Sequence, residues 1–295
     1  MKKLWSLLLV LVLTIALAAC GTTEDVPEEE TDNTQGSTED TGSEDTSWAD
    51  VEAAGTLVVG TSGTYSPITF VDENNNLTGF DVELVREVAD RLGVEVEFSR
   101  MDFDGILPAL RNGQIDIAAN DFAITEGRLE TFDFVIPHKY SYGSIIVRAE
   151  DVDKYESAYD LEGVKVALGS LTSNYAMFAD NIGADGVAYD GGVEAILRDV
   201  INGNRDAYLN DRLVLHRTLE GFGDDRLAVA ENVKYHATES AIIMLKGNTA
   251  LKERLDEVMQ ELIDDGTVAR LSEEFLGEDV SQPVDKSEVV GLDGK

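Results

Sequence analysis

The chain has 295 residues, a net charge of −35 and a single cysteine, Cys20. This acidic balance excludes a nucleic-acid partner, because recognition of phosphates needs a basic surface. One cysteine leaves no partner for an intramolecular disulfide, so the fold must depend on its apolar core. The length predicts one large or two medium domains.

The first residues have the composition of a secretory signal. Lys2 and Lys3 give a basic start, residues 4–16 are almost entirely apolar, and Leu17-Ala18-Ala19 precedes Cys20. Small residues directly before a lone cysteine resemble the lipobox of bacterial lipoproteins. This predicts a signal peptide at 1–19, acylation of Cys20, and a mature protein that is extracytoplasmic and lipid-anchored to the cell membrane of a Gram-positive cell. The alternative is an ordinary signal peptide with an incidental cysteine.

The segment that follows is polar and acidic. Residues 21–47 contain ten Asp or Glu residues and no Lys or Arg. Such a composition cannot bury a core and repels itself, so residues 20–47 are predicted to be a disordered tether. Folded material is expected from about Trp48.

From Trp48 onward, apolar runs of strand length alternate with helical patterns. The spacing of Leu84, Val85, Val88 and Leu92 predicts one face of a helix that Asp81 caps. Strands are predicted at 57–60, 68–71, 94–98, 116–119, 142–148, 164–168, 206–210 and 241–245. Helices are predicted at 81–92, 105–112, 193–201 and 251–263. One further helix starts at 125, one runs through 175 and one ends at 276. Such alternation predicts an α/β protein with mostly parallel sheets. Residues 278–295 are predicted to be a flexible acidic tail.

No catalytic or metal-binding set is recognisable in the sequence. The three histidines have neither HExxH nor another paired metal spacing, residues 60–64 lack the lysine of a phosphate-binding loop, and GxSxG is missing. We therefore expect no cofactor, no bound metal and no catalytic residue.

Arg128 is the first of three positions that suggest ligand binding. Thr125 is a favourable N-cap, which places Arg128 in the first turn of a helix, where a cation opposes the helix dipole. A guanidinium beside free backbone N–H groups can clamp a carboxylate, which would justify that placement. The alternative is a surface arginine paired with Glu126 or Glu130.

The other two positions lie where predicted strands end. Thr172 and Ser173 precede a helix, and Asp211 directly follows the strand 206–210. Ligands of open α/β sheets bind at the carboxyl ends of strands. The alternatives are that Thr172 and Ser173 only cap the helix and that Asp211 only makes a local turn.

Five segments together resemble the polar amino-acid solute-binding proteins of ABC importers, family 3. They are residues 60–67 (GTSGTYSP), 77–82 (LTGFDV), 102–110 (DFDGILPAL), 124–128 (ITEGR) and 132–134 (FDF), and the similarity extends from about Gly55 to Gly277. The resemblance implies a periplasmic-binding-protein type II-like fold, in which two α/β lobes joined by two crossover strands close on a ligand. Lobe 1 would comprise 48–141 plus 241–277, lobe 2 would comprise 146–236, and the crossings would lie near 141–145 and 238–242.

The resemblance also implies roles for eight residues. Arg128 would bind the ligand carboxylate, and Asp211 would bind its ammonium with help from the backbone carbonyl of Asp121. Tyr65 and Phe103 would form an aromatic wall. Thr172 and Ser173 would supply two hydroxyls, and Ala123 would supply a backbone N–H. The sequence departs from the family at several of these positions. Ala123 replaces a hydroxyl residue, Leu171 replaces Gly, Val135 and His138 replace Ser and Tyr, and Asp121 adds a carboxylate that could favour a second ammonium.

Within that family, Asn120-Asp121, residues 138–143 and residues 209–211 look most like Gram-positive cystine-binding lipoproteins. We therefore expect a monomeric receptor that captures an amino acid, L-cystine in particular, and delivers it to an ABC permease with its ATPase subunit without making or breaking a bond. The alternatives are another polar amino acid, a dehydratase-type enzyme on the same fold, or a sensor that signals through a partner.

Overall fold

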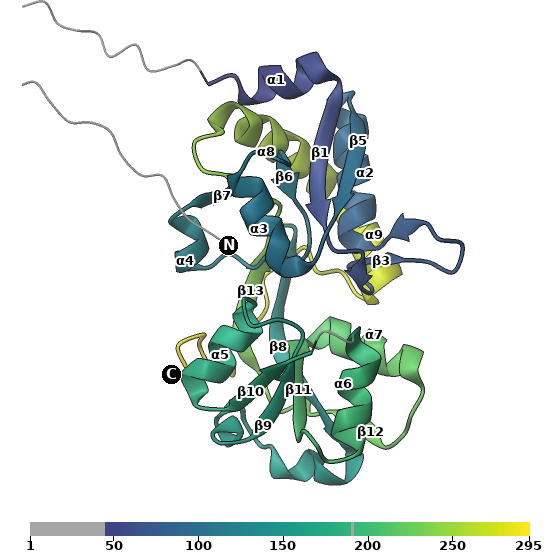
Figure 1. Ribbon diagram of the computed structural model, residues 1–295, viewed down its shortest axis with the longest axis vertical. Helices are drawn as coiled ribbons and strands as arrows, with labels where there is room; N and C mark the ends of the chain where they lie inside the picture. Colours follow the sequence, from purple (N-terminus) through teal and green to yellow (C-terminus); the bar gives the residue numbers. More distant parts are fainter. Residues whose placement is uncertain (1–44, 190–191) are drawn as a thin grey trace, which may run out of the picture. The chain divides into compact units, whose positions relative to one another are not determined.

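The computed structural model describes residues 45–189 and 192–295, whose strands form two main sheets (Figure 1). The predicted signal peptide 1–19, Cys20 and nearly all of the tether 20–47 lie outside the described residues. Asp45 already contacts the folded part, because its carboxylate accepts hydrogen bonds from the backbone N–H groups of Ser47 (2.9 Å) and Ala250 (2.6 Å). Across the described ranges, we find no helix of the length and apolarity that a membrane crossing requires.

Lobe 1 is built on a five-stranded sheet in the order β5-β1-β6-β14-β7. Its strands are β1 (Thr56–Thr61), β5 (Glu95–Arg100), β6 (Ile117–Ala118), β7 (Phe132–Phe134) and β14 (Ile243–Leu245), and its helices are α1 (Ser47–Ala54), α2 (Phe80–Leu92), α3 (Phe103–Arg111), α4 (Glu126–Leu129), α8 (Thr249–Asp264) and α9 (Thr267–Leu276). β1 is parallel to β5 and β6, whereas β14 is antiparallel to β6 and β7. A small three-stranded sheet adds β2 (Thr64–Tyr65), β3 (Thr69–Val71) and β4 (Leu77–Thr78).

The helix α2 confirms the amphipathic pattern but corrects its start. Leu84, Val85 and Val88 are fully buried against α8 and α9, as their spacing predicts. The N-cap is Gly79 (φ 124°), not Asp81. Glycine suits this position, because a Cβ there would lie 2.5 Å from the carbonyl oxygen of Ile68. The Asp81 side chain is therefore free to turn into the interior, where it is 2 % exposed.

Lobe 2 contains a six-stranded sheet in the order β10-β9-β11-β8-β12, with β13 also paired to β8. Its strands are β8 (Lys139–Arg148), β9 (Lys165–Leu168), β10 (Asp185–Ala188), β11 (Ala207–Asp211), β12 (Leu227–Val229) and β13 (Tyr235–Ser240), with α5 (Asn174–Ile182), α6 (Gly192–Ile201), α7 (Arg212–Phe222) and the 3₁₀ turns η1 (Ala149–Lys154) and η2 (Ala158–Leu161) around them. The strands β10, β9 and β11 are parallel, and β8 is antiparallel to its neighbours. One apolar cluster lies under α5 and another under α6 and α7.

The two lobes are connected by β8 and β13, which pair with each other from Tyr235↔Gly143 to Ser240↔Lys139 (Figure 1). The Tyr235 ring stacks on Phe178, with centroids 4.1 Å apart, and its hydroxyl donates to the carbonyl oxygen of Ser144. Gly143 leaves room for this ring, because a Cβ at Gly143 would lie 2.3 Å from it. The close approach therefore fixes the register where the two connecting strands enter lobe 2.

The C-terminal residues 278–295, which the sequence predicts to be a flexible tail, make specific contacts with both lobes. Val280 is 2 % exposed within the core of lobe 1, and its carbonyl oxygen accepts from the N–H of Tyr140. Val290 is 8 % exposed, bridges Tyr235 as a short parallel β-bridge, and packs into the core of lobe 2. Val280 and Val290 supply these apolar contacts, which the acidic composition of the segment does not predict.

Gly143→Ala should lower the free energy of unfolding by about 1–3 kcal/mol, because the added methyl group overpacks a stacked ring. Gly221→Ala, within α7, meets nothing within 4 Å and should stabilise by about 0.5–1 kcal/mol instead. Urea unfolding of both variants checks this. Equal stability of Gly143→Ala and the unmodified protein would show that the Tyr235 ring can move aside.

Candidate functional site

Arg128 is buried in lobe 1 and has no carboxylate partner among the residues that the structure describes. Thr125 is the N-cap of α4 as predicted, and its hydroxyl accepts from the N–H of Arg128. The guanidinium is 9 % exposed, lies 5.2 Å from the centroid of the Phe122 ring, and donates to the carbonyl oxygen of Ala123 at 2.8 Å. Neither Glu126 nor Glu130 pairs with it, and no ion pair to it exists within residues 45–189 and 192–295.

Burial lowers the pKa of Arg128 to about 10, so the side chain remains a cation at neutral pH. A buried cation without an anion is costly, since the charge has lost its hydration. The site therefore favours a ligand that brings a negative charge to this guanidinium.

Two predicted acids, Asp121 and Asp211, lie at the ends of strands from different lobes. Asp211 is fully buried at the end of β11, and its Oδ1 accepts from the N–H groups of Leu213 and Val214 as the N-cap of α7. Asp121 follows β6 with φ 56°, and its N–H donates to Asp81 at 2.6 Å. The left-handed backbone, which Asp adopts more readily than most residues, places its carboxylate toward lobe 2.

Lys139 joins these two acids and was not predicted from the sequence. Its Nζ donates to both oxygens of Asp121 (3.0 and 3.1 Å) and to Oδ2 of Asp211 (2.8 Å), and the side chain is fully buried. Burial alone would lower the pKa of Lys139, but the two carboxylates raise it above its ordinary value. The ammonium that Asp121 contacts in this structure belongs to the protein, and the second ammonium of a ligand stays a prediction.

Tyr65 lies near this charged group, as does Tyr175, which sequence reasoning missed, whereas Phe103 packs on Phe122 beside Arg128. The Tyr65 hydroxyl donates to Asn210 at 2.6 Å, and Phe103 stacks on Phe122 with centroids 5.3 Å apart. Burial raises the pKa of Tyr65 and Tyr175 well above 10, and Asp121 and Asp211 raise it further. Both tyrosines are therefore neutral and can offer hydroxyl groups without adding charge.

The predicted hydroxyl pair has partners within the protein. Ser173 is the N-cap of α5, where its Oγ accepts from the N–H of Ala176 and donates to the carbonyl oxygen of Ser170. Thr172 donates to Asp104 of α3 at 2.6 Å and connects the two lobes instead of facing Arg128. In this structure Ser173 caps α5, as the alternative interpretation expected, and its predicted contact with a ligand stays a prediction.

Two buried histidines also lie near these groups. His138 Nε2 is 3.2 Å from Asp81 Oδ1, and both side chains are 2 % exposed. His236 sits at a β-bulge of β13 with φ 46°, and its buried Nε2 has no hydrogen-bond partner among the described residues. Because a positive φ at a non-glycine residue cannot be read from sequence alone, His236 could not have been predicted as part of the site.

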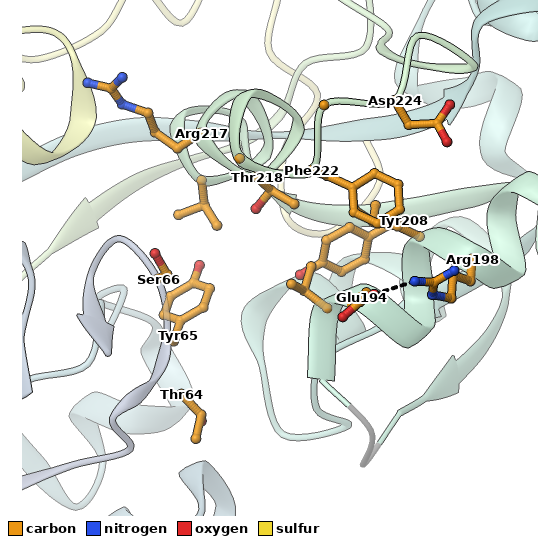
Figure 2. Close-up of a pocket in the computed structure, with 15 residues that line it drawn as sticks. Thr64, Tyr65, Ser66, Glu194, Arg198, Tyr208, Arg217, Thr218, Phe222 and Asp224 are labelled. Atoms are coloured by element: carbon orange, nitrogen blue, oxygen red, sulfur yellow. Dashed lines mark hydrogen bonds and ion pairs between the residues drawn. The ribbon is translucent and has the colours of Figure 1, made fainter. Parts of the chain in front are cut away.

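A cavity of about 690 Å³ lies beyond Tyr65, between β2 and the helices α6 and α7. Figure 2 shows Tyr65 on one side of it and Tyr208, Thr218 and Phe222 on the other, with Glu194 paired to Arg198 at its rim. Asn210 hydrogen-bonds Tyr65 and Tyr208, which both line this cavity, and its Oδ1 also accepts from the N–H of Asp211. The described residues that line the cavity do not include Arg128, Lys139, Asp121 or Asp211.

The arrangement keeps one cation apart from a group of two acids. Arg128 is a buried cation with no carboxylate partner in the described part of the chain, whereas Asp121 and Asp211 share the ammonium of Lys139. Such a site can bind a molecule that carries both a carboxylate and an ammonium. The fold and this polarity define a two-lobed α/β binding protein.

The comparisons with known proteins agree with that class. The model of the bacterial extracellular solute-binding proteins, family 3, matches residues 57–278, and the chain belongs to this family. Its fold is that of the type II periplasmic binding proteins, as the sequence predicts.

Three comparisons define its relatives. The chain is 40 % identical to the probable ABC transporter extracellular-binding protein YckB of Bacillus subtilis, over 82 % of this chain and 86 % of that one, and the YckB crystal structure covers 83 % and 98 % with a TM-score of 0.69. It is 32 % identical to the L-cystine-binding protein TcyA of B. subtilis, over 96 % and 100 %. The unliganded open L-cystine solute receptor of Neisseria gonorrhoeae is 33 % identical, over 80 % and 99 %, with a TM-score of 0.58.

The buried His236 should make the stability depend on pH. Burial, and then the charge of Arg128, lower its pKa from 6.5 to about 4. Between these values the unfolded chain binds a proton that the folded protein does not, so the free energy of unfolding falls as the pH decreases from 6.5 to 4. At about 1.4 kcal/mol per unit, the full effect is on the order of 3 kcal/mol.

Urea unfolding at pH 7.5 and pH 4.5 measures this contribution. His236→Gln should show a smaller decrease between the two pH values than the unmodified protein. His216→Gln, at a position where the imidazole is 44 % exposed, should retain the decrease. The same decrease in His236→Gln would mean that other groups cause it.

Proposed function

We propose that this protein is the receptor of an amino-acid ABC importer. The carrying observation is the buried Arg128 guanidinium, which has no carboxylate partner in the described ranges and lies close enough to Asp121 for its charge to oppose the lowering of the Arg128 pKa by burial. An α-amino acid offers one carboxylate and one ammonium in a fixed relation, which complements this polarity. The receptor would deliver its ligand to a permease and its ATPase subunit and would act as a monomer, without catalysis.

The mechanism is differential binding. Residues that would contact the ligand belong to both lobes, so a bound amino acid would stabilise the conformation in which the lobes approach each other. Contacts such as Thr172–Asp104 and Tyr65–Asn210 already join the two lobes at the rim of the site. The permease would recognise the surface formed in that conformation.

We infer that L-cystine is the ligand within this class. Proteins named for L-cystine binding are 32 % and 33 % identical to the chain over most of its length. Cystine is an elongated molecule with a second amino-acid end, which would pass the Tyr65–Asn210 hydrogen bond to reach the cavity beyond Tyr65. Another polar amino acid is the alternative.

A thermal-shift screen tests the receptor and its specificity. The purified protein, unfolded and refolded to remove carried ligand, is heated with each amino acid and with cystine, because a ligand that binds only the folded state raises its melting temperature. A rise with cystine alone supports both proposals, and a rise with another amino acid supports only the receptor. No rise with any amino acid would favour an enzyme on the same fold, which product analysis would then detect.

Arg128→Lys should weaken binding by roughly 30-fold or more, because an ammonium cannot reproduce the two-point contact of a guanidinium with a carboxylate. Arg111→Lys is the matched control, since Arg111 also lies over a phenylalanine ring, at 5.7 Å, but is exposed on the far end of α3. Isothermal titration with the ligand from the screen compares the two. Unchanged affinity in Arg128→Lys would remove Arg128 from the site.

We also propose that Cys20 anchors the mature protein to the cell membrane through a lipid. Acyl chains retain a protein at a membrane without a spanning helix. In a Gram-positive host, the full chain should fractionate with the membrane, and Cys20→Ser should lose that association. Membrane retention of Cys20→Ser would refute the lipid anchor.

A further inference from the structure

Lys139 is placed where it controls the charge of the binding site. It is the first residue of β8, one of the two strands that connect the lobes, and it pairs with Ser240 of the other connecting strand. Its neighbours on the same face of β8 are Ser141 and Gly143, both buried. The ammonium group cannot reach solvent, so its charge is available only to the groups around it.

The charges that face Lys139 can be counted from the contacts. In their ionised forms, Asp121 and Asp211 contribute two negative charges, and Lys139 contributes one positive charge to both of them through bonds of 2.8–3.1 Å. Burial raises the pKa of Asp121, and the charge of Lys139 opposes that rise. One negative charge therefore remains, which matches a single ammonium. Arg128 contributes the one positive charge that matches a single carboxylate.

The other titratable groups nearby are the same in every variant of Lys139. Asp81 Oδ1 lies 3.2 Å from His138 Nε2, Asp81 accepts from the N–H of Asp121, and its charge acts on Asp121. Tyr65 and Tyr175 are neutral because burial raises their pKa. His236 is neutral because burial lowers its pKa to about 4.

We propose that Lys139 is the residue that sets the charge specificity of the site, selecting amino acids without net charge over cationic ones. With Lys139 present, the four charges of Arg128, Lys139, Asp121 and Asp211 sum to zero and complement a zwitterion. Without it, the two carboxylates are left with one unmatched negative charge, and an amino acid with a cationic side chain would supply the missing partner. This inference rests on the proposed function of the protein.

The role follows from the cost of buried charge. Two carboxylates that approach the same ammonium from different lobes would repel each other strongly if that ammonium were removed. A cation must then enter with the ligand, or one carboxylate must take up a proton. Lys139 prevents both, because it is a permanent part of the chain.

The test compares affinities for neutral and cationic amino acids in three variants. Isothermal titration is carried out with cystine, glutamine, arginine and lysine on the unmodified protein, Lys139→Met, Lys139→Arg, and the double variant Asp121→Asn/Lys139→Met. Methionine keeps the length of the side chain without its charge, and arginine keeps the charge. The double variant removes one negative and one positive charge, so its charge balance equals that of the unmodified protein.

The ratio of the affinity for neutral ligands to that for cationic ligands should fall at least tenfold in Lys139→Met. The same ratio should be retained in Lys139→Arg and should recover in the double variant, even if all affinities of these variants are weaker. A ratio that stays constant in a folded Lys139→Met protein, or that fails to recover in the double variant, would overturn the role of Lys139. If Lys139→Met does not fold, a double variant that prefers cationic ligands would overturn it equally.

The outcome for the unmodified protein separates this inference from the proposed function. If the unmodified protein binds no amino acid in these titrations, the receptor function itself is wrong. If it binds amino acids and Lys139→Met retains the same preference, only the inference about Lys139 is wrong.

Discussion

The structure depends most on one buried interaction, the ammonium of Lys139 held between Asp121 and Asp211. Three charged groups lie together at 0–4 % side-chain exposure, and each would be costly to bury alone. Their mutual contacts compensate for lost hydration only if the ends of β6, β8 and β11 keep their positions. The buried Lys139 therefore holds Asp121, which follows β6 of lobe 1, next to Asp211 at the end of β11 of lobe 2.

The remaining parts of the site are arranged around that point. Asp211 caps α7 while it contacts Lys139, so the helix and the charge cluster support each other. The backbone of Asp121 is held by Asp81, which is itself buried because Gly79 takes over the N-cap of α2. Arg128 lies outside this group, and among the described residues its guanidinium contacts the Ala123 carbonyl and the Phe122 ring. The cluster of Lys139, Asp121 and Asp211 therefore keeps one negative charge, whereas Arg128 is a cation without an anionic partner among the described residues.

Much of this could be predicted from sequence where short-range patterns decide the outcome. The helical spacing of Leu84, Val85 and Val88 predicts α2, Thr125 predicts the start of α4, and the strand before Asp211 places that acid at a sheet edge. The family resemblance then gives the two-lobed fold. The predicted ligand-binding roles of all eight residues remain predictions, since their contacts here are with other protein groups.

Other features depend on contacts between residues far apart in the chain, which no local pattern encodes. Lys139 is one cation beside an apolar strand, and its role requires knowing that Asp121 and Asp211 converge on it from different lobes. His236 has its buried position and positive φ at a β-bulge of β13. The C-terminal segment is held by Val280, which packs in the core of lobe 1, and by Val290, which packs in the core of lobe 2. Sequence identifies the acids and the arginine, whereas their pairing is a property of the tertiary structure.

A crystal structure with the bound amino acid tests the central claim most directly. We expect the ligand carboxylate within hydrogen-bond distance of the Arg128 guanidinium, its ammonium on Asp211, and Lys139 still in contact with Asp121. A ligand bound only in the cavity beyond Tyr65, with Arg128 still without an anionic partner, would contradict the account.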